Sequence, residues 1–594
     1  MSKIASLLTF VLLFSVAVRP QAVPEKNATE DALKLRKEAV AFLRDTLADV
    51  NGMRSLENRL SFTAEMAALM WFYDESEGRA MFTGAIGDYR DLLARYEAEM
   101  NSLGVTLEDR ATRRGPMAFM TEPTEKARVL RKFTTAVGVG QQISMSLAEH
   151  DAELAYSFFF DSLSSIANPE FRKELENSYF ETQLLGQIAD TNASKAAQLA
   201  AKSAAKGVNF SHVELLKKIY KKDPDKGAEF GAVLAGRLKT TKKLESDNFY
   251  VMRMLIDFGG ETLEASRKPS GKRPVYTDSE IRDLVELLAQ AILAQGDEGE
   301  HPMGYLDLIQ RYAPGRAAQI RSKFKISSSN PAANSYATNT AYGYGAPPPP
   351  MRTSSNSNAK GLSRQDQERI EAEERDKKLF DDMMKLGDAK LPKEERERIV
   401  AQSRKIIMQV QGRDKKVTSL SALAAQVAAA GDKELAGEIM KDAEAMVNPA
   451  PKNYQDFLLS WMLATGYASS NPDKAFPILE ETIGRANDTL AAFVKVGEFI
   501  DVAEEMIVDG EVQVGAFGGT MVRGLTRELN IADGTIEVLA KADFAKTKAL
   551  TNRFDRAEIR VLAKMMVLRA VLKPKSIAKP DEDPDLVVDE LTDK

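Results

Sequence analysis

Apolar residues recur every three to four positions along most of this 594-residue chain, which is the spacing of one face of an α-helix. The stretch after Thr277 is the clearest case, because Thr277 and Glu280 have the spacing of a capping box. The apolar stripe that follows has a helical period and consists of Ile281, Leu284, Val285, Leu288 and Ile292. Gly296 then predicts the helix end. Because alternation typical of strands is scarce, the pattern predicts an all-α fold.

A second pattern predicts where one helix ends and the next begins. Five short segments open with Asp or Asn, whose side chains cap a helix by accepting hydrogen bonds from its first amides. All have Ala or Gly at the fifth position, and they are 151–155 (DAELA), 192–196 (NASKA), 223–227 (DPDKG), 432–436 (DKELA) and 471–475 (NPDKA). A small fifth residue lets two helix backbones approach closely. We therefore expect recurring helical hairpins, with a weaker sixth example at 543–547.

Neighbouring starts are 31, 39 and 41 residues apart, which suits one helix–turn–helix unit. The alternative is that capped helices with short loops give such strings in any all-α protein. Segments 428–446 and 469–486 resemble tetratricopeptide-like helical repeats, although the family's Trp–Leu–Gly–Tyr signature is missing and Pro477 stands inside an expected helix. The resemblance implies α-solenoid-like arrays that bind proteins or peptides. The chain is also similar to exported helical proteins of soil bacteria, a likeness that implies no function.

Composition divides the chain into five parts. Segment 326–361 is rich in Ser, Asn, Gly and Pro, a composition that buries too little apolar surface to fold. The acidic, proline-punctuated end is expected to be disordered as well. The predicted parts are a signal peptide (1–22), an N-terminal helical domain (23–325), a flexible linker (326–361), a C-terminal helical repeat domain (362–573) and a disordered tail (574–594). No hairpin start in register falls between 224 and 431, which weakens the idea of one continuous array.

The first residues predict export. Lys3 precedes an apolar run over 4–18, as in a secretory signal peptide, and cleavage is expected after Ala22, with Ala17 as the alternative. The run is shorter than the roughly 20 residues of a membrane-spanning helix, although an uncleaved anchor is the alternative. No later stretch is apolar enough to span a bilayer. We expect a periplasmic or extracellular protein of a bacterial envelope, without a stable membrane span after cleavage.

Charge and cysteine content limit which ligands and reactive groups the protein can use. The formal net charge is −6, with 81 basic and 87 acidic side chains, so nothing global favours nucleic acid. With no cysteine, the chain has no disulfide, no thiol nucleophile and no zinc–thiolate site. A large exported protein without disulfides must rely on its own core.

Few residues are candidates for catalysis or ligand binding, and we assign none of them to a catalytic, cofactor or metal site. His150, His212 and His301 are expected at helix ends or loops as solvated or capping residues. The glycines in 138–140 and 515–519 lack the rest of a nucleotide-binding motif and are interpreted as breaks between helices. A basic cluster interleaved with carboxylates is interpreted as a solvated face, and comprises Lys217, Lys218, Lys221, Lys222, Arg237, Lys239, Lys242 and Lys243.

The sequence thus favours an exported, non-enzymatic scaffold that binds a protein or peptide on stacked helical hairpins. No cofactor is expected, and the partner is not identified. Two alternatives stay open. One is an exported all-α enzyme that processes envelope polysaccharide or peptidoglycan, which requires convergent carboxylates in a pocket. The other is a structural component of the envelope.

Overall fold

The computed structural model describes 30–111, 124–176, 179–241, 244, 246–269, 271–295, 302–326, 385–386, 388, 390–449, 451–499, 507–508, 510–514 and 533–574. The predicted signal peptide lies outside these residues, as does all but the first residue of the predicted linker. The predicted tail also lies outside them, except for Pro574.

The described structure is helical almost throughout, which confirms the all-α prediction. Its only strands are β1 (Ile507–Val508) and β2 (Glu511–Val512), which form a short antiparallel ribbon in which Ile507 pairs with Val512. Gly510 turns between them with a φ of 75°, a left-handed conformation that favours glycine. At Thr277 the capping box forms as predicted, and all five residues of the apolar stripe are buried. This helix ends at Ala294, two residues before Gly296.

Contacts divide the chain into two compact units, and the first boundary between them falls inside one helix. Unit 1 consists of Met1–Ile143 together with Ala359–Lys594, and unit 2 is Ser144–Asn358. The predicted division into two halves at 326–361 is therefore not confirmed. Both ends of the chain belong to the same unit, because the first described helix packs against the last one.

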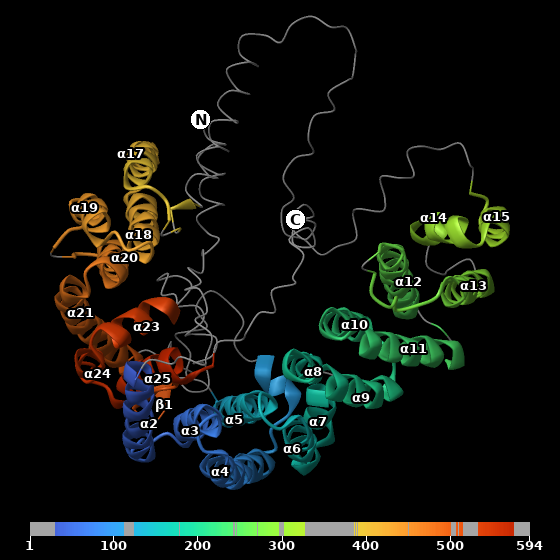
Figure 1. Cartoon of the computed structure of the whole chain (residues 1–594). Coiled ribbons are helices and arrows are strands. Elements are labelled where there is room, and N and C mark those ends of the chain that lie inside the picture. Colours follow the sequence, from blue (N-terminus) through green and yellow to red (C-terminus); the bar gives the residue numbers. More distant parts are fainter. Residues whose placement is uncertain are drawn as a thin grey trace, which may run out of the picture. The chain divides into compact units, whose positions relative to one another are not determined.

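Unit 1 contains helices from both ends of the chain (Figure 1). Those from the N-terminal end are α2 (Glu30–Asn51), α3 (Leu56–Trp71), α4 (Glu75–Leu103), the 3-10 helix η2 (Leu107–Ala111) and α5 (Glu125–Ala148), which continues into unit 2. Those from the C-terminal end are α17 (Lys393–Gln409), α18 (Arg413–Ala429), α19 (Lys433–Glu444), α20 (Tyr454–Ser470), α21 (Pro472–Phe499), α23 (Asp533–Ala542), α24 (Phe544–Thr551) and α25 (Ala557–Leu572).

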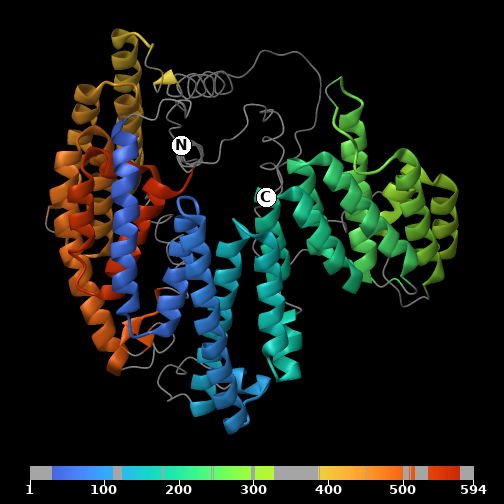
Figure 2. The same cartoon turned by 60° about the horizontal axis from the view of Figure 1, so that its bottom comes forward.

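One hydrophobic core of unit 1 is shared by the two ends of the chain. Helix α2 packs against α25 and α3, as the blue and red helices of Figure 2 show. The core joins Phe42 and Met66 from the N-terminal end to Phe544 and Met565 from the C-terminal end. The Phe42 and Phe544 rings meet edge to face with centroids 6.0 Å apart. Residues more than 450 positions apart in the sequence therefore share one core.

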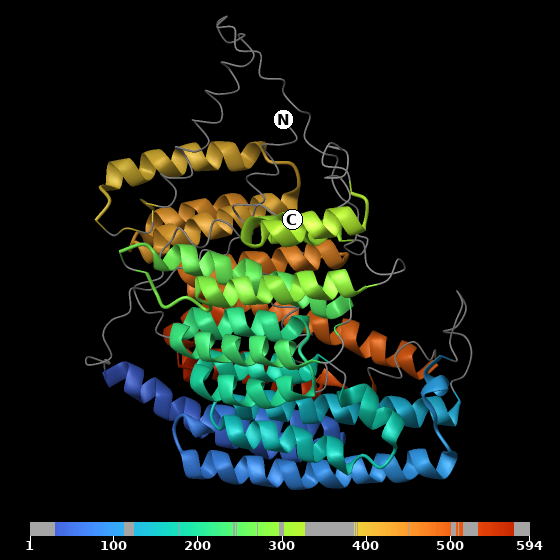
Figure 3. The ribbon, with the colours of Figure 1, turned by 90° about the vertical axis from the view of Figure 1, so that its right-hand side faces the viewer.

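Unit 2 consists of paired helices in two rows. Its elements are α6 (Ala152–Ser165), α7 (Pro169–Glu176), α8 (Phe180–Thr191), α9 (Ala193–Ser203), η4 (Ala204–Lys206), α10 (Phe210–Lys222), α11 (Pro224–Thr240), α12 (Ser246–Ser266), α13 (Asp278–Ala294), α14 (Met303–Tyr312) and α15 (Pro314–Lys323). Figure 1 shows α8, α10, α12 and α14 in one row and α9, α11, α13 and α15 in the other. Successive members of a row pack together, for example α8 on α10 and α9 on α11. The helix axes run roughly side by side (Figure 3).

Candidate functional site

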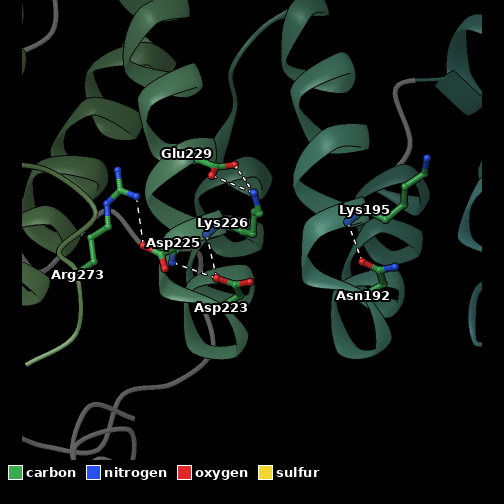
Figure 4. Close-up of polar contacts among 7 residues, drawn as sticks. All are labelled: Asn192, Lys195, Asp223, Asp225, Lys226, Glu229 and Arg273. Carbon is green, nitrogen blue, oxygen red and sulfur yellow. Dashed lines mark hydrogen bonds and ion pairs between the residues drawn. The ribbon is translucent and has the colours of Figure 1, made fainter. Parts of the chain in front are cut away.

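The feature that recurs most often is a helix-to-helix turn made by a single residue. Asn192 ends α8 by donating its backbone N–H to the Ile188 carbonyl at 2.7 Å. The Asn192 side chain then accepts the Lys195 amide at 2.9 Å and so caps α9 (Figure 4). Asp223 plays both parts between α10 and α11, with Pro224 at the first helical position. One residue thus pairs a free carbonyl at the end of the first helix through its backbone N–H, and a free amide at the start of the second helix through its side chain.

The predicted hairpin starts all lie at helix junctions. Asn192, Asp223, Asn471 and Asp543 are each the single residue between two helices, whereas three residues separate the helices at Asp151 and Asp432. Side-chain caps form at Asp151, Asn192, Asp223, Asp432 and Asp543, and α21 begins directly after Asn471 as expected. All but Asp432 share one backbone geometry, with φ between −157° and −132° and ψ between 83° and 97°. Asp432 differs because Gly431, at a φ of 94°, precedes it. The pattern of caps in the sequence therefore located real helix junctions.

The small fifth residue has the role expected of it. Ala155, Ala196, Ala436 and Ala475 are completely buried. At Gly227 an added Cβ would lie 2.7 Å from the Tyr220 Cα of the preceding helix. The two helix backbones approach closely here, which explains why no larger side chain occupies the position.

Two further helix junctions were not predicted from the sequence, a three-residue one that ends at Asp74 and a one-residue one at Ala313. Asp74 caps α4 by accepting the Glu77 amide, and a Cβ on Gly78 would lie 2.9 Å from the Trp71 Cα. Ala313 joins α14 to α15 with a similar φ of −141°, and Ala317 at the fifth position is fully buried. Alanine has no side-chain oxygen that could cap a helix, so the sequence does not mark this turn. The second turn lies in the range where no start in register was expected.

Ion pairs connect successive turns along their exposed edge. The carboxylate two residues after one cap meets a cation from a later hairpin in three places: Glu153 with Lys195 at 3.0 Å, Asp225 with Arg273 at 3.2 Å, and Asp473 with Lys546 at 3.1 Å. The second of these is drawn in Figure 4. All are at least partly exposed, so each contributes at most about 1 kcal/mol. Their regular position makes them markers of the repeat more than sources of stability.

A pair of exposed aromatic rings lies where two helices of one row begin. Phe210 is the first residue of α10 and Tyr250 lies in the first turns of α12. The rings stack with centroids 6.2 Å apart, and the residues are 44% and 50% exposed. Tyr179, just before α8, is 74% exposed. Exposed aromatic rings are typical of surfaces that bind other proteins.

Unit 1 holds a buried polar network that joins the ends of the chain. The Glu511 carboxylate accepts the backbone amides of Arg54 at 2.7 Å and Ser55 at 3.0 Å. Asn58 donates its side-chain amide to the Val512 carbonyl at 3.0 Å. The Gln513 side-chain amide donates to the Ser55 hydroxyl at 2.9 Å. These hydrogen bonds connect the start of α3 to the β-ribbon.

Two more buried carboxylates extend the network. Glu57 accepts the Tyr96 hydroxyl at 2.5 Å with one oxygen and the Ser55 hydroxyl at 3.0 Å with the other. Glu558 accepts the Val512 amide at 3.1 Å and pairs with Arg556 at 2.5 Å. These oxygen atoms are engaged by groups of the protein itself, which suits a structural role better than acid–base chemistry.

The histidines lie in different places. His212 is a capping residue as predicted, forming a capping box with Asn209 at the start of α10, but it is 4% exposed and not solvated. Burial lowers the pKa of His212, and the nearby Glu181 carboxylate partly opposes that shift. His150 lies in the turn before Asp151, and His301 is outside the described residues.

The two glycine segments have different outcomes. The prediction of a break at 138–140 is wrong, because α5 continues through it. A Cβ on Gly140 would overlap the Tyr89 phenol, so this glycine permits close packing inside a helix. Segment 515–519 lies outside the described residues.

The predicted basic cluster is divided among separate ion pairs. Lys217 pairs with Glu214 at 3.0 Å, and Lys218 pairs with Asp190 of α8 at 2.7 Å. A third cluster member, Lys239, pairs with Asp283 at 2.9 Å. Lys242 and Lys243 lie outside the described residues. These pairs agree with a solvated face rather than an anion-binding patch.

The chain has no match among known proteins that would assign it to a family. The chain matches no family model, and neither a similar curated protein nor a similar solved structure was found. Within the described ranges, no helix combines the length and apolar character needed to cross a membrane. The same residues include no group of three or more histidines and carboxylates suited to a metal ion.

Proposed function

We propose that this protein is an exported, non-enzymatic helical-repeat scaffold that binds a protein or peptide. The recurring capped junction carries the proposal, because it joins helices into hairpins, and those of unit 2 pack in two rows. Stacked hairpins of this kind present extended surfaces, and such surfaces are commonly used to bind chains. The stacked, exposed pair of Phe210 and Tyr250 on one row supports a contact point for a partner.

The engagement of the buried carboxylates favours a scaffold over an enzyme. Glu57, Glu511 and Glu558 are each at most 7% exposed and accept hydrogen bonds from the protein itself. A glycan-processing site needs carboxylates that face a substrate.

The binding test is selection of peptides from a random display library on the purified mature protein. We expect enriched peptides that bind with measurable affinity by fluorescence anisotropy. The double variant Phe210→Ala/Tyr250→Ala should weaken this binding about tenfold, the size of a modest hot spot. Leu33→Ala/Met408→Ala is the matched control, because both residues are exposed to a similar degree on unit 1. A library that yields no binding peptide would contradict the scaffold proposal.

Export is tested separately. The apolar run that starts the chain supports removal of 1–22 during secretion. Intact-mass analysis of protein from the envelope fraction should show a mature chain that begins near Val23. A full-length chain recovered from the cytoplasm would contradict export while leaving the binding proposal in place.

A further inference from the structure

The start of α3 depends on a residue from the other end of the chain. Ser55 caps α3 with its hydroxyl, which accepts the Asn58 amide at 3.2 Å. The amides of Arg54 and Ser55 lie just before the helix and have no acceptor in α3 itself. The Glu511 carboxylate accepts both, at 2.7 and 3.0 Å. A carboxylate at a helix start is favoured by the helix dipole, and hydrogen bonds to an ionised acceptor are the stronger kind.

The β-ribbon and the start of α3 depend on each other. Glu511 is 7% exposed and Ser55 is fully buried, so neither has ready access to water. A buried amide without an acceptor is costly, and an unpaired buried carboxylate is costlier. Removing either partner while the other stays buried incurs this cost, so the ribbon and the start of α3 stabilise each other.

The same contact reaches α25, the last of the described helices. Next to Glu511, the Val512 amide donates to Glu558 in the first turn of α25 at 3.1 Å. Further along α25, Lys564 pairs with Asp49 of α2 at 2.6 Å. The ribbon thus joins α3 to α25, and α25 returns to α2. The shared apolar core lies among these elements.

We propose that Glu511 is a latch residue that makes α2, α3, the β-ribbon and α25 one cooperative element, so that α2 and α3 become stable only together with α25. The proposal concerns folding and does not depend on what the protein binds. Its consequence is that α2 and α3 do not become stably folded until the β-ribbon and α25 are present. In an exported chain, this delay would favour passage through a membrane channel before folding.

The test is hydrogen–deuterium exchange on the full mature chain carrying Glu511→Ala. We expect exchange at α2, α3 and α25 to rise together by about tenfold or more, because the buried Ser55 amide and the part-buried Arg54 amide lose their charged acceptor. Helices α10 and α11 of unit 2 should keep their wild-type exchange. Glu481→Ala is the matched control, since it removes an exposed carboxylate that pairs only within its own helix, with Arg485. The control should leave α2, α3 and α25 unchanged.

A confined response would overturn the proposal. If exchange rises in the first turn of α3 but not in α25, Glu511 is a local cap and no latch. If Glu511→Ala does not fold, pulse labelling during refolding of the wild-type chain replaces it. Protection of α2 and α3 should then appear in the same kinetic phase as protection of α25. Earlier protection of α2 and α3 would overturn the latch.

Discussion

At the scale of single residues, the fifth position of the hairpin turn shows how a backbone contact selects an amino acid. Gly227 and Gly236 lie in the same helix, α11, but differ in their surroundings. A Cβ on Gly227 would lie 2.7 Å from the Tyr220 Cα, whereas nothing lies within 4 Å of a Cβ on Gly236. The first glycine is required by packing, and the second is not.

We expect Gly227→Ala to lower the free energy of unfolding by about 2 kcal/mol, because two helix backbones must separate. Gly236→Ala is the matched control and should raise it by about 0.5–1 kcal/mol, since alanine favours the helix. Urea unfolding followed by circular dichroism, combined with hydrogen exchange at α11, measures both. Equal effects of the two substitutions would contradict the close approach at the turn.

His212 gives a prediction about pH. Burial lowers its pKa in the folded state, relative to an ordinary value of 6.5. The unfolded chain therefore takes up this proton first, and the stability that the neutral ring contributes is present above pH 6.5 and lost as the pH falls below it. His212→Gln should keep the capping box, because glutamine suits that position, and should lose less stability between pH 7 and pH 5 than the wild type.

The measurement is the thermal midpoint of both proteins at pH 7 and pH 5, with hydrogen exchange at α10 to localise the change. The glutamine variant keeps every other titrating group, so the difference between the two proteins isolates His212. Equal losses in both proteins would show that His212 does not contribute to acid sensitivity.

At the scale of elements, the ion pairs between turns test whether hairpins stack in a defined order. Glu153 of α6 pairs with Lys195 of α9, one turn later along the chain. We expect Glu153→Lys to lower the free energy of unfolding by about 0.5 kcal/mol, since like charges then face each other. The swap Glu153→Lys/Lys195→Glu should restore most of it. A double-mutant cycle at low and high salt measures the coupling, and a swap that restores nothing would contradict the pairing.

Sequence alone predicted these elements well where a side chain carries the signal. Asp151, Asn192 and Asp223 cap helices because their oxygen atoms fit the first amides of a helix, whatever the tertiary structure. Ala313 makes a similar turn with backbone alone and was not found. The glycines at 138–140 were misjudged, since glycine is both a helix breaker and a means of close packing. Only the position of Tyr89 decides between these roles.

At the scale of the molecule, the shared core predicts that the chain survives a cut in the segment that the sequence assigns to a linker. The helices at 30–103 pack against those at 533–572 without needing that segment. We expect a chain with a site-specific protease sequence inserted after Asn356 to elute as one species after cleavage. Size-exclusion chromatography with and without urea measures this. Two separate fragments without denaturant would contradict the shared core and support independent halves.

The sequence by itself determined the all-helical fold and most hairpin junctions, because caps, small residues and apolar stripes act within a few positions of each other. Tertiary structure alone decided that both ends of the chain form one unit. The network around Glu511 depends on partners about 457 positions away. No local pattern records such a pairing, since a glutamate on a short strand satisfies the same local rules whether or not it meets a helix start. The hairpins remain the repeating feature of the molecule, and the contact between the chain's ends determines how its two terminal segments are assembled.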